Sequence, residues 1–476
     1  MTRTFPDRFL FGAATAAYQI EGAAREDGRT DSIWDAFARI PGAVLGQHDG
    51  EVACDHYHRY RDDVALMKDL GIQVYRFSTS WSRVRPDGGP VNPAGLDFYS
   101  RLVDELLEAD ILPWPTLYHW DMPQVLEERG GWTSRDTVDR FVEYALDVHG
   151  ALGDRVRTWT TLNEPWCSSF LSYTAGAHAP GRQSARDGLL ASHHLLLAHG
   201  RTAEELRRAA PGLEVGITLN LTVADAADPT DPADRDAARR IDGQFNRWFL
   251  DPLRQGSYPD DVVEDIRRVD ADAVGAFESA VREGDLATIA QPLDFLGVNY
   301  YHGELVAGSP ADEPPAGGEA PTSRPTRSPF PSHEGIHWRE RGLPRTSMGW
   351  EVQPDGLTRL LERVARDVPG VPLYVTENGA AYDDRVVDGE VDDPERTAYV
   401  RAHVAAVAVA AGRGVDVRGY FYWSLLDNYE WAWGYDKRFG IVHVDYETQE
   451  RTVKASGREY ARIVAARAVD MPAVAY

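Results

Sequence analysis

Two glutamates, Glu164 and Glu377, end short apolar runs in the motifs Thr-Leu-Asn-Glu-Pro and Thr-Glu-Asn-Gly. A lone glutamate is usually a salt-bridging or capping residue at a surface. Two carboxyl groups among aromatic and amide side chains can instead face each other across a cavity. Such a pair can supply the proton donor and the nucleophile or base that cleave a glycosidic bond. We expect Pro165 to hold Glu164 in an extended conformation and Gly379 to let the chain turn out of its strand.

Polar residues also end other apolar runs, in a pattern that core packing does not require. They are Arg76, the segment 118–121, the segment 299–301 and the segment 423–431. If these runs are strands of one barrel, their end residues gather at one rim, together with the two glutamates.

Other catalytic chemistries find little support in the sequence. It contains no G-x-S-x-G motif, no phosphate-binding loop, no convincing dinucleotide fingerprint and no H-E-x-x-H motif. The segment 54–58, Cys-Asp-His-Tyr-His, superficially resembles a metal cluster. It lacks a second ligand group at zinc-like spacing and precedes a helical pattern at 60–70, so we expect Asp55 to cap that helix. We predict no metal and no cofactor.

Eight short apolar or aromatic runs alternate with helical patterns along the chain. The runs lie at 9–14, 72–78, 111–117, 156–162, 215–221, 293–299, 373–377 and 417–423. The spacing of apolar residues predicts helices at 96–107, 138–148, 355–368 and 394–412. This alternation predicts an α/β fold, a single (β/α)8 TIM barrel over residues 1–476 with long βα loops.

Residues 307–346 fit no element of this pattern, because they are polar and rich in proline. They follow the sixth predicted strand. We expect a long, flexible loop insertion at the mouth of the barrel, and a disordered excursion without function is the alternative.

Composition excludes several classes of partner. Of 476 residues, 75 are acidic and 50 are basic, and the net charge is −25. Nucleic acids and anionic membranes require a basic surface, so we expect neither as a partner. No apolar run reaches the ~18 residues of a membrane span. A homo-oligomer stays compatible with this composition.

The two cysteines, Cys54 and Cys167, exclude a disulfide framework, and we expect both to be reduced. The first 17 residues only weakly resemble a secretory signal. We therefore predict a cytoplasmic protein and disregard the glycosylation sequon at 220–222.

Six motifs in order resemble those of the β-glucosidases of glycoside hydrolase family 1. They lie at 9–22, 75–78, 119–123, 161–165, 374–379 and 422–424, and the similarity extends to 451–456. The resemblance thus covers nearly the whole chain. It implies a retaining enzyme that hydrolyses terminal non-reducing β-D-glucosyl residues from β-glucosides and short oligosaccharides by double displacement, with a role in cellulose degradation. The implied partner is a small-molecule β-glycoside.

The resemblance also implies roles for individual residues. Glu164 is the implied acid/base and Glu377 the implied nucleophile. Arg76 and Tyr301, placed next to Glu377, would keep it ionised, whereas the pKa of Glu164 should be raised. The implied sugar-binding residues are Gln19, His119, Asn163, Glu430 and Trp431, with Trp423 as a stacking floor. Asn299 is an expected supporting residue, and Phe439 and the segment 307–346 are expected to border the aglycone.

Some alternatives stay open within this resemblance. One branch of the family acts on 6-phosphosugars and carries Ser, Lys and Tyr where this chain has Glu430, Lys437 and Phe439. A carboxylate repels a phosphate, so the resemblance favours unphosphorylated glycosides. A preference for β-galactosides or β-fucosides, or transglycosylation by the same residues, is not excluded. A sugar-binding barrel without activity is the non-enzyme alternative, and the intact pair of glutamates argues against it.

Overall fold

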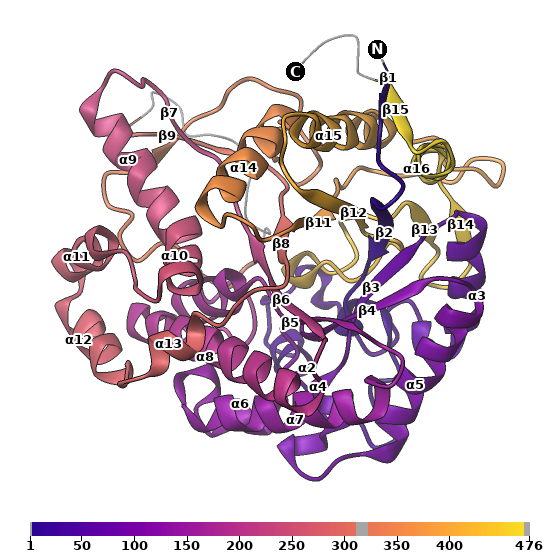
Figure 1. The fold of residues 1–476 in the computed structure, drawn as a ribbon, viewed down its shortest axis with the longest axis horizontal. Coiled ribbons are helices and arrows are strands. Elements are labelled where there is room, and N and C mark those ends of the chain that lie inside the picture. The colour runs from indigo at the N-terminus through magenta and orange to yellow at the C-terminus, as the bar shows by residue number, and fades with distance from the viewer. Residues whose placement is uncertain (1, 311–321, 471–476) are drawn as a thin grey trace.

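The computed structural model describes residues 2–310 and 322–470, and its centre is a closed barrel of parallel strands (Figure 1). Round the barrel the strands follow the order β2, β3, β4, β5, β6, β8, β11, β12, and β12 pairs with β2 to close it. Their bounds are β2 Leu10–Ala14, β3 Val74–Ser78, β4 Leu112–Tyr118, β5 Thr158–Asn163, β6 Glu214–Asn220, β8 Leu296–Asn299, β11 Leu373–Asn378 and β12 Val417–Trp423. Each strand overlaps one predicted run, so the predicted (β/α)8 barrel is confirmed.

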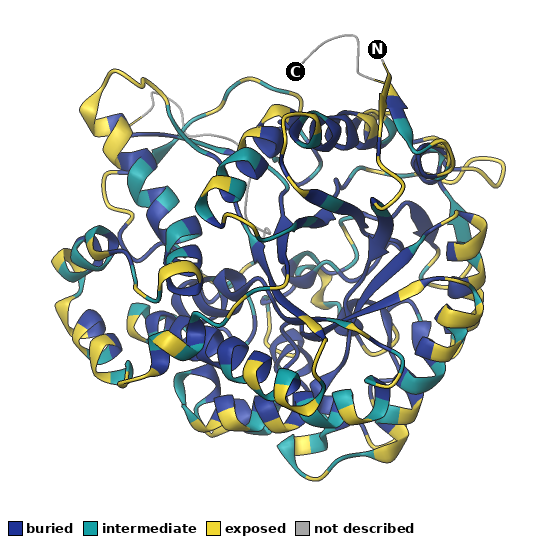
Figure 2. Ribbon diagram, viewed as in Figure 1, coloured by how far each residue is buried: buried dark blue, intermediate teal, exposed yellow. Residues whose placement is uncertain are grey.

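Helices surround the barrel, and Figure 2 shows buried strands at the centre and exposed residues on the outer faces of the helices. The predicted helices correspond to α5, α7, α14 and α15. Proline occupies the first helical positions of α5, α14 and α15, where its missing N–H costs no hydrogen bond. The helices are α1 Ala17–Ile20, α2 Ile33–Ala38, α3 His56–Asp69, α4 Trp81–Val84, α5 Pro93–Glu108, α6 Gln124–Glu128, α7 Asp136–Leu152, α8 Ala185–Ala209, α9 Pro232–Asp242, α10 Trp248–Gln255, α11 Asp260–Val269, α12 Ala271–Ala280, α13 Asp285–Ile289, α14 Pro354–Asp367, α15 Pro394–Gly412 and α16 Ala455–Ala466.

The described residues also form three small sheets outside the barrel. Near the chain ends β1 Thr2–Thr4 pairs with β15 Ala468–Asp470, and β13 Val442–Val444 pairs with β14 Arg451–Val453. The third sheet contains β7 Ala224–Ala226, β9 Glu304–Ala307 and β10 His337–Trp338. Strands of two to four residues are too short for a periodic pattern, so the sequence did not predict them.

Part of the expected insertion at 307–346 can be followed. Residues 311–321 lie outside the described residues. Beyond them, Arg324 donates hydrogen bonds to the carbonyl oxygens of Gly176 and Gly181. The Gln244 side chain exchanges two hydrogen bonds with the backbone of Ser332, at 2.8 and 3.0 Å. These contacts attach the segment to the loops after β5 and β6, and its flexibility stays a prediction.

Asp55 is the residue before α3, but the expected capping hydrogen bond is wrong. Its side chain accepts no hydrogen bond from the first backbone amides of the helix that the structure describes. Its φ of 53° departs from the extended backbone of a capping residue. The carboxylate instead accepts from His58 Nδ1 at 2.6 Å and Arg59 Nε at 3.0 Å.

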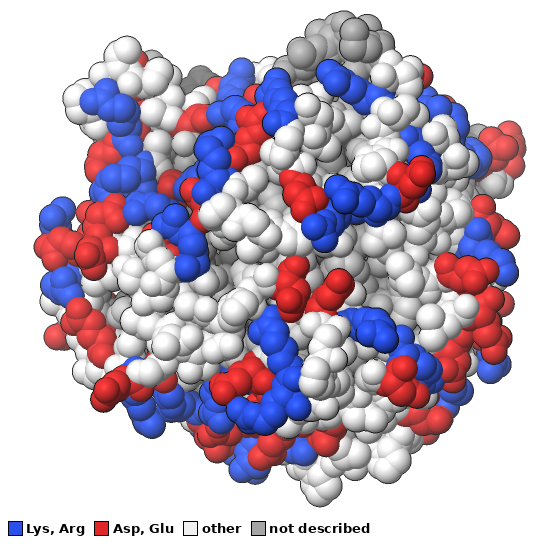
Figure 3. Space-filling view, in the orientation of Figure 1, with Lys and Arg blue, Asp and Glu red and all other residues white. Residues whose placement is uncertain are grey.

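On the face shown in Figure 3, acidic and basic side chains are interspersed rather than gathered by sign. Many surface arginines pair with a carboxylate, as Arg25 does with Glu51 and Arg85 does with Glu143. None of the described helices combines the length and the apolar character that crossing a bilayer requires.

Candidate active site

A cavity of about 770 Å³ opens where the barrel strands end at their carboxyl termini. Most of the predicted site residues line it: His119, Glu164, Asn299, Tyr301, Glu377, Trp423, Glu430, Trp431 and Phe439. Arg76 and Asn163 lie behind this lining and hydrogen-bond to it. Gln19 donates to the backbone carbonyl of Tyr429, next to Glu430. The structure therefore brings the predicted residues together at one end of the barrel.

Both carboxylate oxygens of Glu377, in β11, accept a hydrogen bond. Arg76, in β3, donates from Nη1 to Oε1 at 2.6 Å, and Tyr301 donates from its hydroxyl to Oε2 at 2.7 Å. Arg76 also donates from Nη2 to Asn163 Oδ1 at 2.7 Å. One guanidinium thus joins Glu377 to the residue that precedes Glu164.

The glycine after β11, Gly379, is required for a reason other than the turn that we expected it to allow. A Cβ at Gly379 would lie 1.6 Å from the carbonyl oxygen of Trp423. The ends of β11 and β12 approach too closely for any side chain there. Close packing of two backbones, and not a left-handed conformation, requires this glycine.

Glu164 follows β5 with a backbone φ of 48°, so the expected extended conformation is wrong. The chain turns at this residue from the strand into the helical segment that follows, and its N–H donates to the Thr218 carbonyl at 2.9 Å. A left-handed conformation is strained for a residue with a side chain, and such strain is common at functional positions. Asn299 donates to Glu164 Oε1 at 2.6 Å, and the Cys167 thiol lies 3.1 Å from Oε2.

The two glutamates differ in electrostatic surroundings. Burial, and then the charge of Glu377, raise the pKa of Glu164 to about 8. Burial also raises the pKa of Glu377, but the charge of Arg76 and hydrogen bonds from Arg76 and Tyr301 oppose that shift. Glu164 has only neutral donors in direct contact, so it holds a proton more readily than Glu377.

Asn163 and His119 form a chain with fixed donors and acceptors. Asn163 Oδ1 accepts from Arg76 and from Asn299, so its amide nitrogen is the donor toward His119 Nε2, at 3.0 Å. Burial and the charge of Arg76 lower the pKa of His119 well below its ordinary value. The imidazole is therefore neutral and carries its proton on Nδ1.

Several buried polar atoms in this region lack a hydrogen-bond partner among the described residues: Gln19 Oε1, His119 Nδ1 and Glu430 Oε2. Unpaired buried polar groups are costly, so they indicate a place for a polar ligand. Burial, then Glu377 and Glu164, raise the pKa of Glu430 to about 8. Gln19 Oε1 can accept a hydrogen bond, His119 Nδ1 can donate one, and the Glu430 carboxyl group can do either. Sugar hydroxyls both donate and accept, so these groups match them.

Aromatic rings pack around this polar group. Trp431 lies against Trp120 and Trp34, with ring centroids 4.5 and 4.7 Å apart. The His119 ring is nearly parallel to Trp423 and Trp431, at 5.6 and 5.9 Å. These contacts fix the positions of the indoles, and Trp423 and Trp431 both line the cavity, where they can offer apolar surface to a ligand.

The sequence did not identify a further group of residues that line the cavity: Trp166, Cys167, His178, Asn220, Phe245 and Trp350. Trp166 and Cys167 closely follow Glu164, so proximity to that motif was a usable signal. Phe245 comes from the π-helical segment Gly243–Arg247, whose local pattern gives no such indication.

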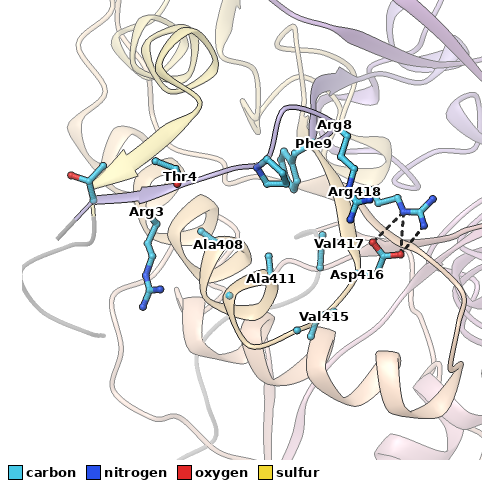
Figure 4. A pocket seen from close by; sticks show the side chains of 14 residues that line it. Arg3, Thr4, Arg8, Phe9, Ala408, Ala411, Val415, Asp416, Val417 and Arg418 are labelled. Carbon is cyan, nitrogen blue, oxygen red and sulfur yellow. Dashed lines mark hydrogen bonds and ion pairs between the residues drawn. The ribbon is translucent and has the colours of Figure 1, made fainter.

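A second hollow, of about 610 Å³, lies at the other end of the barrel (Figure 4). Phe9, before β2, and Val417, at the start of β12, are among its lining residues. Arg418 there is paired with Asp416 at 2.8 Å. Reactive groups of such barrels stand at the carboxyl ends of the strands, so this hollow is not a candidate active site.

Comparison with known proteins identifies the family of this barrel. The sequence model of glycosyl hydrolase family 1 matches residues 1–469. The chain belongs to glycosyl hydrolase family 1. Within this family, it is 51% identical over 465 residues to a thermostable beta-glucosidase B of Thermobispora bispora, covering 97% of this chain and 90% of that protein. It is 47% identical to a bifunctional beta-D-glucosidase/beta-D-fucosidase of Bifidobacterium breve, covering 98% and 99% of the two chains.

Solved structures of the family agree with the fold. The psychrophilic beta-glucosidase of Micrococcus antarcticus is 56% identical, with a TM-score of 0.94 and coverage of 98% of both chains. The beta-glucosidase of Thermotoga maritima in complex with deoxynojirimycin is 40% identical, with a TM-score of 0.87 and coverage of 98% and 99%. The predicted family membership is therefore confirmed, and this chain is a glycoside hydrolase.

Proposed function

We propose that the protein is a retaining β-glucosidase in which Glu164 is the general acid/base and Glu377 is the nucleophile. Its substrates are terminal non-reducing β-D-glucosyl residues of β-glucosides and short oligosaccharides. One observation carries the assignment of roles: Arg76 and Tyr301 bind the Glu377 carboxylate directly, whereas Glu164 contacts an amide and a thiol. The cation favours the ionised form of Glu377, and its absence leaves Glu164 to hold the proton.

The first step forms a glycosyl-enzyme. A carboxylate oxygen of Glu377 attacks C1 of the sugar, the bond from C1 to the glycosidic oxygen breaks, and Glu164 gives its proton to that oxygen. In the second step Glu164 removes a proton from water, whose oxygen attacks C1 and releases Glu377. Two inversions retain the β configuration.

The change of role at Glu164 follows from the loss of a charge. Once Glu377 is an ester, its negative charge no longer raises the pKa of Glu164. Glu164 therefore loses its proton to the leaving group and stays ionised until it activates water. Arg76, released from its charge partner, still donates to Asn163 Oδ1 and holds that amide in place behind the cavity lining.

The unpaired polar atoms of Gln19, His119 and Glu430 support a sugar subsite that these three residues form with Asn163 and Trp431, with Trp423 as its floor. Glu430 stands where a phosphate-binding site would need a neutral donor, which favours unphosphorylated sugars. The relative that also cleaves β-D-fucosides leaves a broader sugar preference as a second candidate. Transglycosylation by the same residues is the third.

The aglycone would occupy the outer part of the cavity. Phe439 and several residues of the segment 322–346 line the cavity, which supports the expected aglycone border. Cellulose degradation, a cytoplasmic location and a homo-oligomer stay predictions.

The proposal is tested by the anomer of the first product. We expect proton NMR of early turnover of 4-nitrophenyl β-glucoside to show β-glucose, and comparison with the β-galactoside and β-fucoside to rank the sugars by kcat/KM. An α-anomeric first product would contradict the retaining mechanism, and absence of turnover of all three would contradict the proposed activity.

A further inference from the structure

A thiol stands beside the acid/base carboxyl inside the cavity. Cys167 is the first residue of the π-helical segment Cys167–Ala175, three positions after Glu164. It is buried and lines the cavity, and its Sγ lies 3.1 Å from Glu164 Oε2. The side-chain amide of Asn220 donates to the sulfur at 3.6 Å. The three side chains form a row from Asn220 through Cys167 to Glu164.

The two oxygens of the Glu164 carboxyl are held unequally. Oε1 accepts from the Asn299 amide at 2.6 Å, whereas Oε2 is contacted by the thiol. An amide N–H is a strong donor and a thiol is a weak one. An oxygen that already accepts a short hydrogen bond is a poor place for a proton, so the proton of the acid form resides on Oε2.

We propose that Cys167 is a positioning residue for Glu164, whose thiol keeps Oε2 directed into the cavity while stabilising the carboxylate only weakly. The inference rests on the proposed role of Glu164 as acid/base. It goes beyond that role by assigning a task to a side chain that is neither the acid/base nor the nucleophile.

A hydroxyl group at the same place would act differently. A serine O–H donates a shorter and stronger hydrogen bond to a carboxylate than a thiol does. It would favour the ionised form of Glu164 and lower its pKa. An alanine would leave Oε2 without that partner, which favours the protonated form but frees the carboxyl group to rotate.

The thiol can play this part because it stays protonated. Burial, followed by the charge of Glu164, raises the pKa of Cys167 well above its ordinary value. The side chain is therefore an S–H donor throughout the working pH range and adds no charge to the site.

The other groups around Glu164 would be unchanged by a substitution at Cys167. The titratable and charged groups that face Glu164 are Arg76 on β3, Glu377 on β11, Tyr301 after β8 and Glu430 after β12. If the pKa of Glu164 changes in the order of the hydrogen-bonding strength of the side chain at position 167, that side chain is the cause.

The experiment compares pH profiles of kcat/KM for the wild type, Cys167→Ser and Cys167→Ala with 4-nitrophenyl β-glucoside. We expect the apparent pKa of the basic limb to be lowest in Cys167→Ser, intermediate in the wild type and highest in Cys167→Ala, with steps of about half a pH unit. Ser168→Ala is the matched control, because Ser168 follows in the same segment and is not part of the described cavity lining. Its basic limb should coincide with that of the wild type.

A second readout separates positioning from general damage. A dinitrophenolate leaving group needs no proton, whereas an alkoxide does. We expect Cys167→Ala to reduce kcat/KM for methyl β-glucoside about 10-fold more than for 2,4-dinitrophenyl β-glucoside. General loss of packing would reduce both equally.

The outcomes separate the role of Cys167 from the role of Glu164. If Glu164→Gln loses the basic limb with the activated substrate but neither Cys167 variant moves it and both substrates fall equally, Cys167 only packs and the inference is wrong. If Glu164→Gln retains the basic limb, the acid/base assignment is wrong and the inference is overturned with it.

Discussion

The guanidinium of Arg76 lies 2.6 Å from the Glu377 carboxylate, Nη1 to Oε1, and both side chains are buried. The residues are 301 positions apart in sequence and belong to β3 and β11, which are not paired in the barrel. A buried carboxylate without a cation would take up a proton and lose its nucleophilicity. This ion pair keeps Glu377 ionised and, through Asn163, ties it to the strand that ends at Glu164.

Removing the Arg76 charge should move the acidic limb of the pH profile. Arg76 opposes the upward shift that burial imposes on the pKa of Glu377, so Arg76→Gln raises that pKa further. We expect kcat/KM for 4-nitrophenyl β-glucoside to fall about 100-fold or more, with the acidic limb at higher pH. Arg61→Gln removes an exposed guanidinium on α3 and should change neither. An unmoved acidic limb in Arg76→Gln would contradict the role of this ion pair.

A phosphate on the sugar should be a disadvantage. Glu430 lines the cavity, and burial, followed by the charges of Glu377 and Glu164, raises its pKa to about 8. A 6-phosphate would bring a dianion to this cluster of carboxyl groups. We expect kcat/KM for 4-nitrophenyl β-glucoside to exceed that for its 6-phosphate by about 100-fold or more. Comparable values for the two substrates would show that Glu430 does not face the 6-position.

The barrel was predictable from the sequence because parallel strands buried on both faces are continuous apolar runs. The end motifs, such as the one around Glu164, also predicted side chains that the structure brings together at one rim. Contacts across the barrel depend on closure of the sheet and leave no local periodicity, so the contact of Arg76 with Glu377 was expected only from the family resemblance. The backbone of Glu164 was predicted wrongly because its neighbour Pro165 favours an extended residue, whereas the chain must turn there into the next helix.

A buried charge network around Asp427, which follows β12, should contribute to stability. Asp427, fully buried, accepts from Lys454 at 2.6 Å and Arg438 at 2.7 Å. Burial raises the pKa of Asp427, but the charges of Lys454 and Arg438 outweigh it and lower that pKa. Its contribution to stability is therefore present above the pKa of an unfolded aspartate and is lost as the pH falls through the folded pKa.

Replacing this carboxylate leaves the buried Lys454 ammonium group with Asp384 as its remaining carboxylate partner. We expect Asp427→Asn to reduce the free energy of unfolding by about 3 kcal/mol at neutral pH. Asp436→Asn, which removes a half-exposed partner of Lys437, should change it by less than about 0.5 kcal/mol. Urea denaturation of both variants measures the difference, and equal stability of the two would contradict a structural role for the network.

The two glutamates should fail differently when each is replaced by alanine. In Glu164→Ala, Glu377 still forms the glycosyl-enzyme from dinitrophenyl β-glucoside, because that leaving group needs no proton. Hydrolysis then stalls for want of a base, so we expect a burst followed by slow turnover. Azide can occupy the vacated space and attack C1 from the side that water would use, which gives the β-glucosyl azide.

Glu377→Ala lacks the group that forms the covalent bond, so no leaving group restores the normal first step. Azide in the place of the lost carboxylate attacks from the opposite face and gives the α-glucosyl azide. NMR of the azide products therefore reports which face each glutamate serves. Reversed anomers would mean that the two roles are exchanged, and near-wild-type hydrolysis of an unactivated glucoside by both variants would place the chemistry outside the site formed by Glu164 and Glu377.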